Sequence, residues 1–186
     1  QIKTQIAEYK LATKNINISD VAAAFGNVAL KDITVCIEIS KATPEVISFT
    51  KTDKNITLMV EPIGFEITCK ANGKEIKIDS FNSYVERKIP IPADIDHKKV
   101  TTALVVEKDG TLRTVPTRVV NMDGKYFAIV NSLTNSYYAL VSIKTNIKDI
   151  DKHWAKDSIN EMASKLIIKG NESSNSTCSA VSGAKA

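Results

Sequence analysis

Apolar and polar residues alternate with a period of two through most of the chain between residues 33 and 143. This period places successive side chains on opposite faces of a β-strand, so it predicts half-buried sheets. Pro and Gly interrupt the run 56–71 at residues 61–64, which predicts a bulge, a kink or a change of partner strand there. We expect about eight strands, over residues 33–40, 56–71, 74–78, 84–91, 100–107, 111–120, 125–130 and 136–143.

Three dipeptides mark tight turns between these runs: Asn72-Gly73, Asp109-Gly110 and Asp123-Gly124. Such pairs readily adopt the positive φ angles that short hairpin loops need. Helical patterns of roughly 10–15 residues do not alternate with the strands, which disfavours a parallel α/β sheet. The predicted fold class is therefore mainly β, an antiparallel β-sandwich.

Two helices are expected outside the strands. Ser19-Asp20 has the residue types of an N-cap before the apolar residues 21–25, and Gly26 would end this short N-terminal helix. Near the other end, the apolar residues of 157–169 lie on one helical stripe. This stripe predicts a C-terminal amphipathic helix that ends at Gly170.

The last residues, 171–186, are polar and small and show no periodicity. Such a tract favours disorder over a packed element. The predicted organisation is a β-sandwich module over residues 1–145, a distinct segment over 146–170 and a disordered tail over 171–186.

Composition narrows the functional classes. The chain has 186 residues, of which 43% are hydrophobic and 25% charged, enough for a folded core. Its net charge is +4, but the Lys residues are spread along the chain, whereas nucleic-acid binders cluster theirs. The apolar runs all fall short of the roughly 20 residues that span a membrane. Residue 1 is Gln and no signal peptide follows, a pattern that a mature exported protein would share.

The chain contains three cysteines, Cys36, Cys69 and Cys178, and two histidines. Cys36 and Cys69 lie in strand-like runs, so both are expected to be buried as small apolar residues. A disulfide between them would require neighbouring strands. Because the sequence has no CxxC motif and no Cys/His cluster, we expect neither a metal nor a cofactor.

Residues 147–170 carry a spaced motif: Asp149-Ile150, then His153-Trp154-Ala155, then an amphipathic helix that closes with Ile167-Ile168 and Gly170. The motif resembles the first half of an S-layer homology (SLH) repeat, which attaches exported bacterial proteins to cell-wall polysaccharide. The resemblance implies an extracellular protein associated with the cell wall or S-layer. It assigns glycan contact to Asp149, His153 and Trp154. The Arg, Phe and Pro of the second half of a repeat are absent from 171–186, so we expect the anchor to continue in a longer parent protein.

A structural role for Trp154 needs no glycan. A Trp at the start of an amphipathic helix would pack that helix onto the preceding β-module, and His153 would cap backbone groups there. Within this chain we expect this packing role.

Residues 32–143 resemble the β-module that often precedes SLH repeats in surface proteins of Gram-positive bacteria. The stretches that carry the resemblance are 81–92, 109–117, 123–128 and 131–136. The resemblance implies a non-catalytic spacer or interaction module between upstream domains of the same chain and the wall anchor. The alternative is a β-module that itself binds carbohydrate or wall polysaccharide, with Tyr84, Tyr126, Tyr137 and Tyr138 as candidate sugar platforms.

The segment Ser132-Leu133-Thr134 precedes an aromatic strand and resembles the cleavage site of GAIN-type autoproteolytic folds. In that family a His, a Leu and a Thr or Ser nucleophile follow one another, and the His takes the proton of the nucleophile. Ser132 stands at the His position, and a Ser hydroxyl is no base at neutral pH. We therefore expect an inactive motif. Since the sequence also lacks a nucleophile elbow, a P-loop and a dinucleotide fingerprint, we predict no enzymatic activity.

Overall fold

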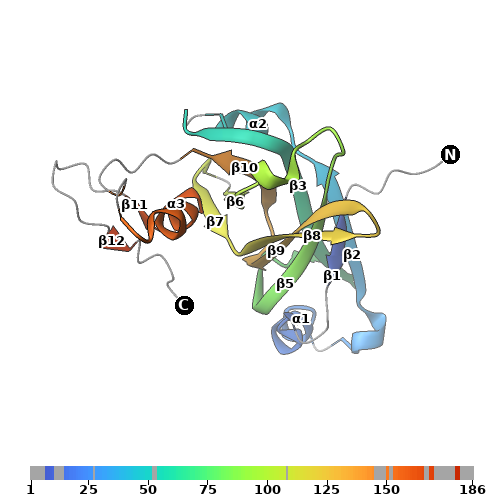
Figure 1. The fold of residues 1–186 in the computed structure, drawn as a ribbon. Coiled ribbons are helices and arrows are strands. Elements are labelled where there is room, and N and C mark those ends of the chain that lie inside the picture. The colour runs from blue at the N-terminus through green and yellow to red at the C-terminus, as the bar shows by residue number, and fades with distance from the viewer. Residues whose placement is uncertain are drawn as a thin grey trace.

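The computed structural model describes residues 7–10, 15–26, 28–51, 54–107, 109–144, 150, 153–165, 168–169 and 179–180. Two antiparallel sheets pack face to face, with short helices around them (Figure 1). The predicted mainly β class and the β-sandwich are confirmed.

The first sheet has the strand order β1-β5-β9-β8. The second has the order β2-β3-β10-β6-β7, and β4 also pairs with β3. The strands of the first sheet are β1 (Glu8–Lys10), β5 (Ser80–Ile91), β8 (Thr117–Met122) and β9 (Lys125–Thr134). Those of the second are β2 (Thr34–Lys41), β3 (Ile56–Ala71), β4 (Lys74–Lys77), β6 (Thr102–Val106), β7 (Leu112–Val115) and β10 (Tyr137–Ile143).

The main core lies between the sheets. Ile89 and Val130 from the first sheet meet Phe65, Tyr138 and Leu140 from the second, and all are buried. A second cluster forms where the helix α1 (Ile18–Ala24) and Phe25 cover the far part of β3. Burial of these apolar side chains is the main favourable term that holds the two sheets together.

Two predicted turns have the backbone that tight hairpins require. Asn72 and Gly73 have φ angles of 49° and 72°, and Asp123 and Gly124 have 51° and 77°, as in a type I′ turn. At the third turn Gly110 has a φ of 84°. Sequence therefore located these three reversals correctly.

The run 56–71, with its Pro and Gly, forms one unbroken strand, β3. Two of the three alternatives occur. The partner changes, because β10 pairs with residues 56–64 and β4 pairs with residues 68–71. A bulge is also present on β3: Ile63 lies opposite Tyr138 and Val60 opposite Leu140, so Glu61 and Pro62 stand against one residue of β10. β3 contributes to both core clusters, with Ile63 and Phe65 in the first and Ile67 and Cys69 in the second.

The run 111–120 is not one strand, as predicted, but two. β7 ends at Val115 and belongs to the second sheet, whereas β8 starts at Thr117 and belongs to the first. Pro116 between them has no N–H to donate, so it favours the point where the chain leaves one ladder for the other.

Alternating buried and exposed side chains were predicted over 100–107, and this prediction is wrong. All five residues of β6 are buried, because Ala103 and Val105 face the core between the sheets and Leu104 joins a further cluster with Ala139 and Val141. A strand covered on both faces does not show a half-buried pattern.

The short helices differ from the predictions. α1 begins at Ile18, before the predicted cap, while Gly26 does adopt a positive φ of 76° just beyond the helix. A further helix, α2 (Pro44–Phe49), was not predicted. Its signal is local: the Thr43 hydroxyl accepts from the Val46 N–H, and Pro44 occupies the first turn, a position where Pro is favoured. None of the helices in the described parts of the chain is long and apolar enough to span a membrane.

The two cysteines of the second sheet have different environments. Cys69 is buried as predicted, but Cys36 is exposed, and both thiols are free. Cys69 lies opposite Val35 and Cys36 opposite Thr68. The two sulfur atoms therefore project from opposite faces of the sheet, which excludes a disulfide between them in this geometry.

Candidate functional site

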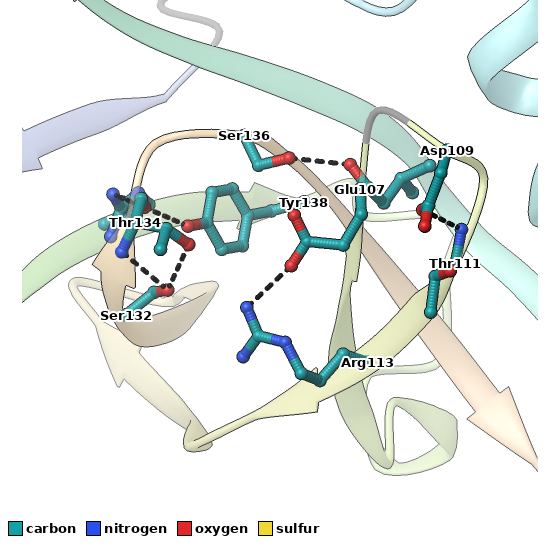
Figure 2. Close-up of polar contacts among 10 residues, drawn as sticks. Glu107, Asp109, Thr111, Arg113, Ser132, Thr134, Ser136 and Tyr138 are labelled. Carbon is teal, nitrogen blue, oxygen red and sulfur yellow. Dashed lines mark hydrogen bonds and ion pairs between the residues drawn. The ribbon is translucent and has the colours of Figure 1, made fainter. Parts of the chain in front are cut away.

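The Ser132-Leu133-Thr134 motif forms the last three residues of β9, directly before the turn into β10. Ser132 Oγ lies 3.3 Å from Thr134 Oγ1, and the Thr134 N–H donates to Ser132 Oγ over 3.3 Å (Figure 2). Ser132 is buried and Leu133 is 41% exposed. The residue in the base position thus contacts the hydroxyl of the nucleophile position, although a Ser hydroxyl cannot hold its proton.

The carbonyl of Thr134 accepts two hydrogen bonds. Arg87 Nη2 donates over 2.6 Å and the Tyr138 hydroxyl over 2.5 Å (the latter in Figure 2). The guanidinium carbon of Arg87 lies 4.5, 5.5 and 6.0 Å from the ring centres of Tyr138, Phe65 and Phe81. Aromatic faces at this distance attract a cation. The cluster fixes the backbone just beyond the Leu133–Thr134 bond.

Sequence reasoning missed Arg87, which is fully buried on β5. The signal was present, because Arg87 occupies the inward row of an alternating strand between Val85 and Ile89. A cation in an apolar row indicates a buried hydrogen-bonding role, since an unsatisfied buried charge is costly.

Asn135 and Ser136 hold the turn against both sheets. The Asn135 side-chain amide donates to the Ile78 carbonyl over 2.6 Å, and its backbone N–H donates to the Asp79 carbonyl over 3.0 Å. The Ser136 hydroxyl donates to the Val106 carbonyl over 2.6 Å. These three hydrogen bonds connect the turn to the segment before β5 and to the end of β6.

A pocket of about 340 Å³ opens beside this turn. The Tyr137 ring lies against Gly64, since a Cβ added to Gly64 would come within 2.7 Å of Tyr137 Cε1. The Tyr137 ring therefore packs directly on the backbone of Gly64, and a side chain at position 64 would displace the ring. The residues that line the pocket are Glu38, Ser40, Glu45, Val46, Phe49, Gly64, Phe65, Glu66, Lys77, Asp79, Val106, Glu107, Asn135, Ser136 and Tyr137.

Two of the pocket's carboxylates are paired with cations. Lys77 Nζ lies 2.9 Å from Glu66, and this hydrogen bond, aided by the charge of Glu66, raises the pKa of Lys77. Arg113 Nη2 lies 2.7 Å from Glu107 (Figure 2). Carboxylate oxygens accept hydrogen bonds, so the pocket can bind hydroxyl donors beside an aromatic ring.

The four tyrosines proposed as sugar platforms are dispersed. Tyr138 is fully buried and Tyr137 lines the pocket, whereas Tyr84 is 59% exposed on β5. Tyr126 stacks on His97, with ring centres 3.4 Å apart and planes at 9°. Tyr137 combines an accessible pocket with neighbouring acceptors, and its ring is not stacked on another ring as that of Tyr126 is.

The SLH-like segment places its aromatic residues at the start of α3 (Lys156–Ser164). His153 Nδ1 accepts from the Ala155 N–H over 3.1 Å, which is the cap predicted for this residue. The rings of His153 and Trp154 lie 5.6 Å apart. Trp154 is 92% exposed, so the expectation that it packs α3 onto the β-module is wrong. Asp149 lies outside the described residues.

The helix α3 is shorter than predicted. It ends at Ser164, and Ile168–Lys169 form a short strand, β11, paired with β12 (Ser179–Ala180). On the predicted apolar stripe, Ala163 is buried and Ile159 partly buried, but Met162 is 46% exposed. One turn separates Ile159 from Ala163, so these two share the inward face. Gly170 lies outside the described residues.

A second cavity, of about 670 Å³, lies between α3 and the β-module. The stacked His97 and Tyr126 line it together with Arg118, Lys98 and Lys165. Lys165 Nζ lies 2.6 Å from Glu161, and that hydrogen bond lowers the pKa of Glu161. Within the described residues, no three side chains of His, Cys, Asp or Glu come together as metal ligands would.

Comparison with known protein families finds a match in the C-terminal segment. Residues 146–175, 30 of the 186 residues, match the S-layer homology domain family. The match includes His153 and Trp154 and continues five residues past the predicted end of the segment. SLH domains are anchoring modules that bind cell-wall polysaccharide, so the match indicates a cell-wall-anchoring surface protein. No curated protein and no solved structure matches the chain.

Proposed function

We propose that residues 1–145 are a non-catalytic spacer and interaction module of an exported surface protein of a Gram-positive bacterium, which is anchored through SLH repeats. The observation that carries the proposal is the position of the SLH match: it begins at residue 146, directly after β10 ends at Ile143. The module would hold upstream domains of the same protein away from the wall.

The SLH segment supports this role through its exposed aromatic pair. Trp154 projects into solvent beside His153. A Trp side chain offers a large apolar surface whose burial against a partner is favourable. In the parent protein, complete SLH repeats or their polysaccharide would cover Trp154, and Asp149, His153 and Trp154 would contribute to the anchor rather than to the β-module.

Co-sedimentation with purified Gram-positive sacculi tests the proposal. The present chain is compared with a version that continues into complete SLH repeats. We expect only the extended version to pellet, and a matched extended version with Trp154→Ala to pellet less than one with Tyr84→Ala. Pelleting of the present chain alone would show that the β-module binds the wall and would overturn the spacer role.

A second function, glycan binding by the β-module itself, is favoured by the Tyr137 pocket. An aromatic ring beside carboxylate and hydroxyl acceptors is the arrangement that recognises a sugar face and its hydroxyl groups. The lining residues Ser40, Glu38 and Ser136 supply such groups around Tyr137.

This second function has its own test. Wall oligosaccharides are titrated into the chain while amide signals are followed by NMR. Binding in the pocket predicts shifts around Gly64 and Ser136 that Tyr137→Ala abolishes and Tyr84→Ala preserves. Unchanged spectra would leave the spacer as the function of the module.

A further inference from the structure

The second sheet ends in a long, unprotected edge strand, β2. Its eight residues pair with β3 on one side, and no strand in the described parts of the chain pairs with its other side. Natural edge strands are usually short or carry Pro or inward-facing charges, which prevent pairing with other chains. β2 has no Pro, and its charged residues are Glu38 and Lys41.

The other sheet edges are better protected. β1 has three residues, β4 and β7 have four each, and Pro116 follows β7 directly. The edge strand β8 carries Arg118, whose side chain is 65% exposed. β2 is therefore the edge on which a further strand could add over the greatest length.

The exposed side chains of β2 include apolar residues that another strand could bury. Val35 is 48% and Ile37 is 49% exposed, although both lie on the same face of the sheet as the buried residues Cys69 and Ile67. At the two ends of this apolar row, Ile33 and Ile39 are partly buried against the two core clusters. The apolar row thus contacts the core at both ends, while its two central side chains are exposed to solvent.

We propose that β2 pairs with β2 of a second copy of this chain, antiparallel about a two-fold axis at Cys36. This register places Val35 of each copy opposite Ile37 of the other, and Ile33 opposite Ile39. Cross-strand pairs of β-branched residues stabilise a sheet. The two second sheets become one continuous sheet across the dimer.

The acidic residue and the thiol of β2 fit this register. Glu38 comes opposite Thr34 of the other copy, whereas a two-fold axis at position 38 would oppose Glu38 to itself, which costs free energy. Lys41 falls opposite Lys31, which lies in the 3-10 helix Leu30–Asp32, outside the strand. The two Cys36 residues face each other, with Cα atoms about 4.5–5.5 Å apart, within the range that a disulfide spans.

Cys36 provides a specific readout of this contact. It is exposed, whereas burial raises the pKa of the Cys69 thiol and keeps it protonated. Because Cys178 lies outside the described residues, the cross-linking experiment uses the whole chain with Cys178→Ser. Addition of a thiol oxidant such as diamide then reports whether two Cys36 thiols meet.

The test combines mass in solution with cross-linking. In reducing buffer, sedimentation should show a dimer that Ile37→Lys converts to a folded monomer, whereas Met122→Lys, on the exposed part of β8, should leave the dimer intact. Oxidation should give a disulfide-linked dimer that Cys36→Ser abolishes and Ile37→Lys reduces at least tenfold in yield. Circular dichroism checks that both lysine variants remain folded.

Three outcomes would overturn the proposal. The first is a monomer at every concentration tested, as expected if β2 instead accepts a strand of a different protein. The second is a dimer that survives Ile37→Lys. The third is a Cys36 cross-link whose yield is independent of Ile37, which would reflect random collision of exposed thiols.

Discussion

Arg87 Nη2 donates to the Thr134 carbonyl over 2.6 Å, and these residues lie 47 positions apart in the chain. A fully buried cation on β5 thereby holds the end of β9. Because the cation sits among three aromatic rings and donates to backbone carbonyls, its removal leaves both a void and unsatisfied acceptors.

Replacement of Arg87 should therefore destabilise the fold strongly. We expect Arg87→Ala to lower the free energy of unfolding by about 3 kcal/mol. Arg118→Ala is the matched control, because the Arg118 side chain is 65% exposed, and it should change the value by less than about 0.5 kcal/mol. Urea unfolding followed by circular dichroism measures both. Equal losses in the two variants would contradict a structural role for Arg87.

Gly64 and Tyr137 should be energetically coupled. A Cβ at Gly64 would lie 2.7 Å from Tyr137 Cε1 and 2.9 Å from Ser40 Oγ. Gly64→Ala should thus cost about 1–3 kcal/mol through overpacking. Combined with Tyr137→Ala, the same change should cost less, since the ring that it meets is gone.

A double-mutant cycle of urea midpoints measures this coupling. Additive losses in the double variant would show that the Tyr137 ring does not rest on Gly64, and the sugar platform proposed for the pocket would lose its support.

The Leu133–Thr134 bond should remain intact. Ser132 lies near the Thr134 hydroxyl but cannot act as its base. Intact-mass spectrometry should show no fragment that ends at Leu133 or begins at Thr134, both before and after treatment with hydroxylamine, which would cleave an ester formed by attack of Thr134. Thr134→Ala serves as the control. Fragments that separate at this bond in the natural chain but not in the control would prove self-cleavage.

The turn at Asp109 should contribute stability that depends on pH. The Thr111 N–H donates to Asp109 Oδ1 over 2.9 Å (Figure 2), and hydrogen bonds from Thr111 lower the pKa of Asp109. A carboxylate with a lowered pKa stabilises the fold above its ordinary pKa of 3.8, and this stability is lost as the pH falls through the folded value.

Thermal melts at pH 7 and pH 2.5 test this dependence. Asp109→Ala should have a lower Tm than the natural chain at pH 7, and the difference should shrink at the acid pH. Asp109→Asn keeps an acceptor for the Thr111 N–H without a charge, so its Tm difference from the Ala variant should change less with pH. A gap between natural chain and Ala variant that is equal at both values would contradict the pKa shift.

Local signals explain what could be predicted of the fold. The Asn-Gly and Asp-Gly turns depend on backbone freedom within two residues, so sequence located them correctly. The helix α2 carries an equally local signal in Thr43-Pro44 and could have been predicted. In contrast, the exchange of sheets at Pro116 and the double burial of β6 depend on which elements cover each face, which a period of two does not encode.

In the candidate site, too, local contacts could be predicted from the sequence and long-range contacts could not. Ser132 and Thr134 are two positions apart on one strand, so their proximity follows from sequence. The contacts of Arg87 with Thr134 and of Tyr137 with Gly64 arise from strand pairing across long separations. The exposure of Trp154 also could not be predicted, because the motif alone does not say what covers the ring.

The place of β10 has a mechanical consequence for a wall-attached protein. This last strand of the sandwich lies between β3 and β6 and is bonded to both, and its C-terminal end points toward the side where α3 lies (Figure 1). Tension transmitted from a wall anchor would pull β10 along its own axis. Both ladders would then have to slide together instead of opening one bond at a time, and this raises the barrier to forced unfolding. The sandwich would accordingly be connected to the wall through a strand that is hydrogen-bonded on both sides.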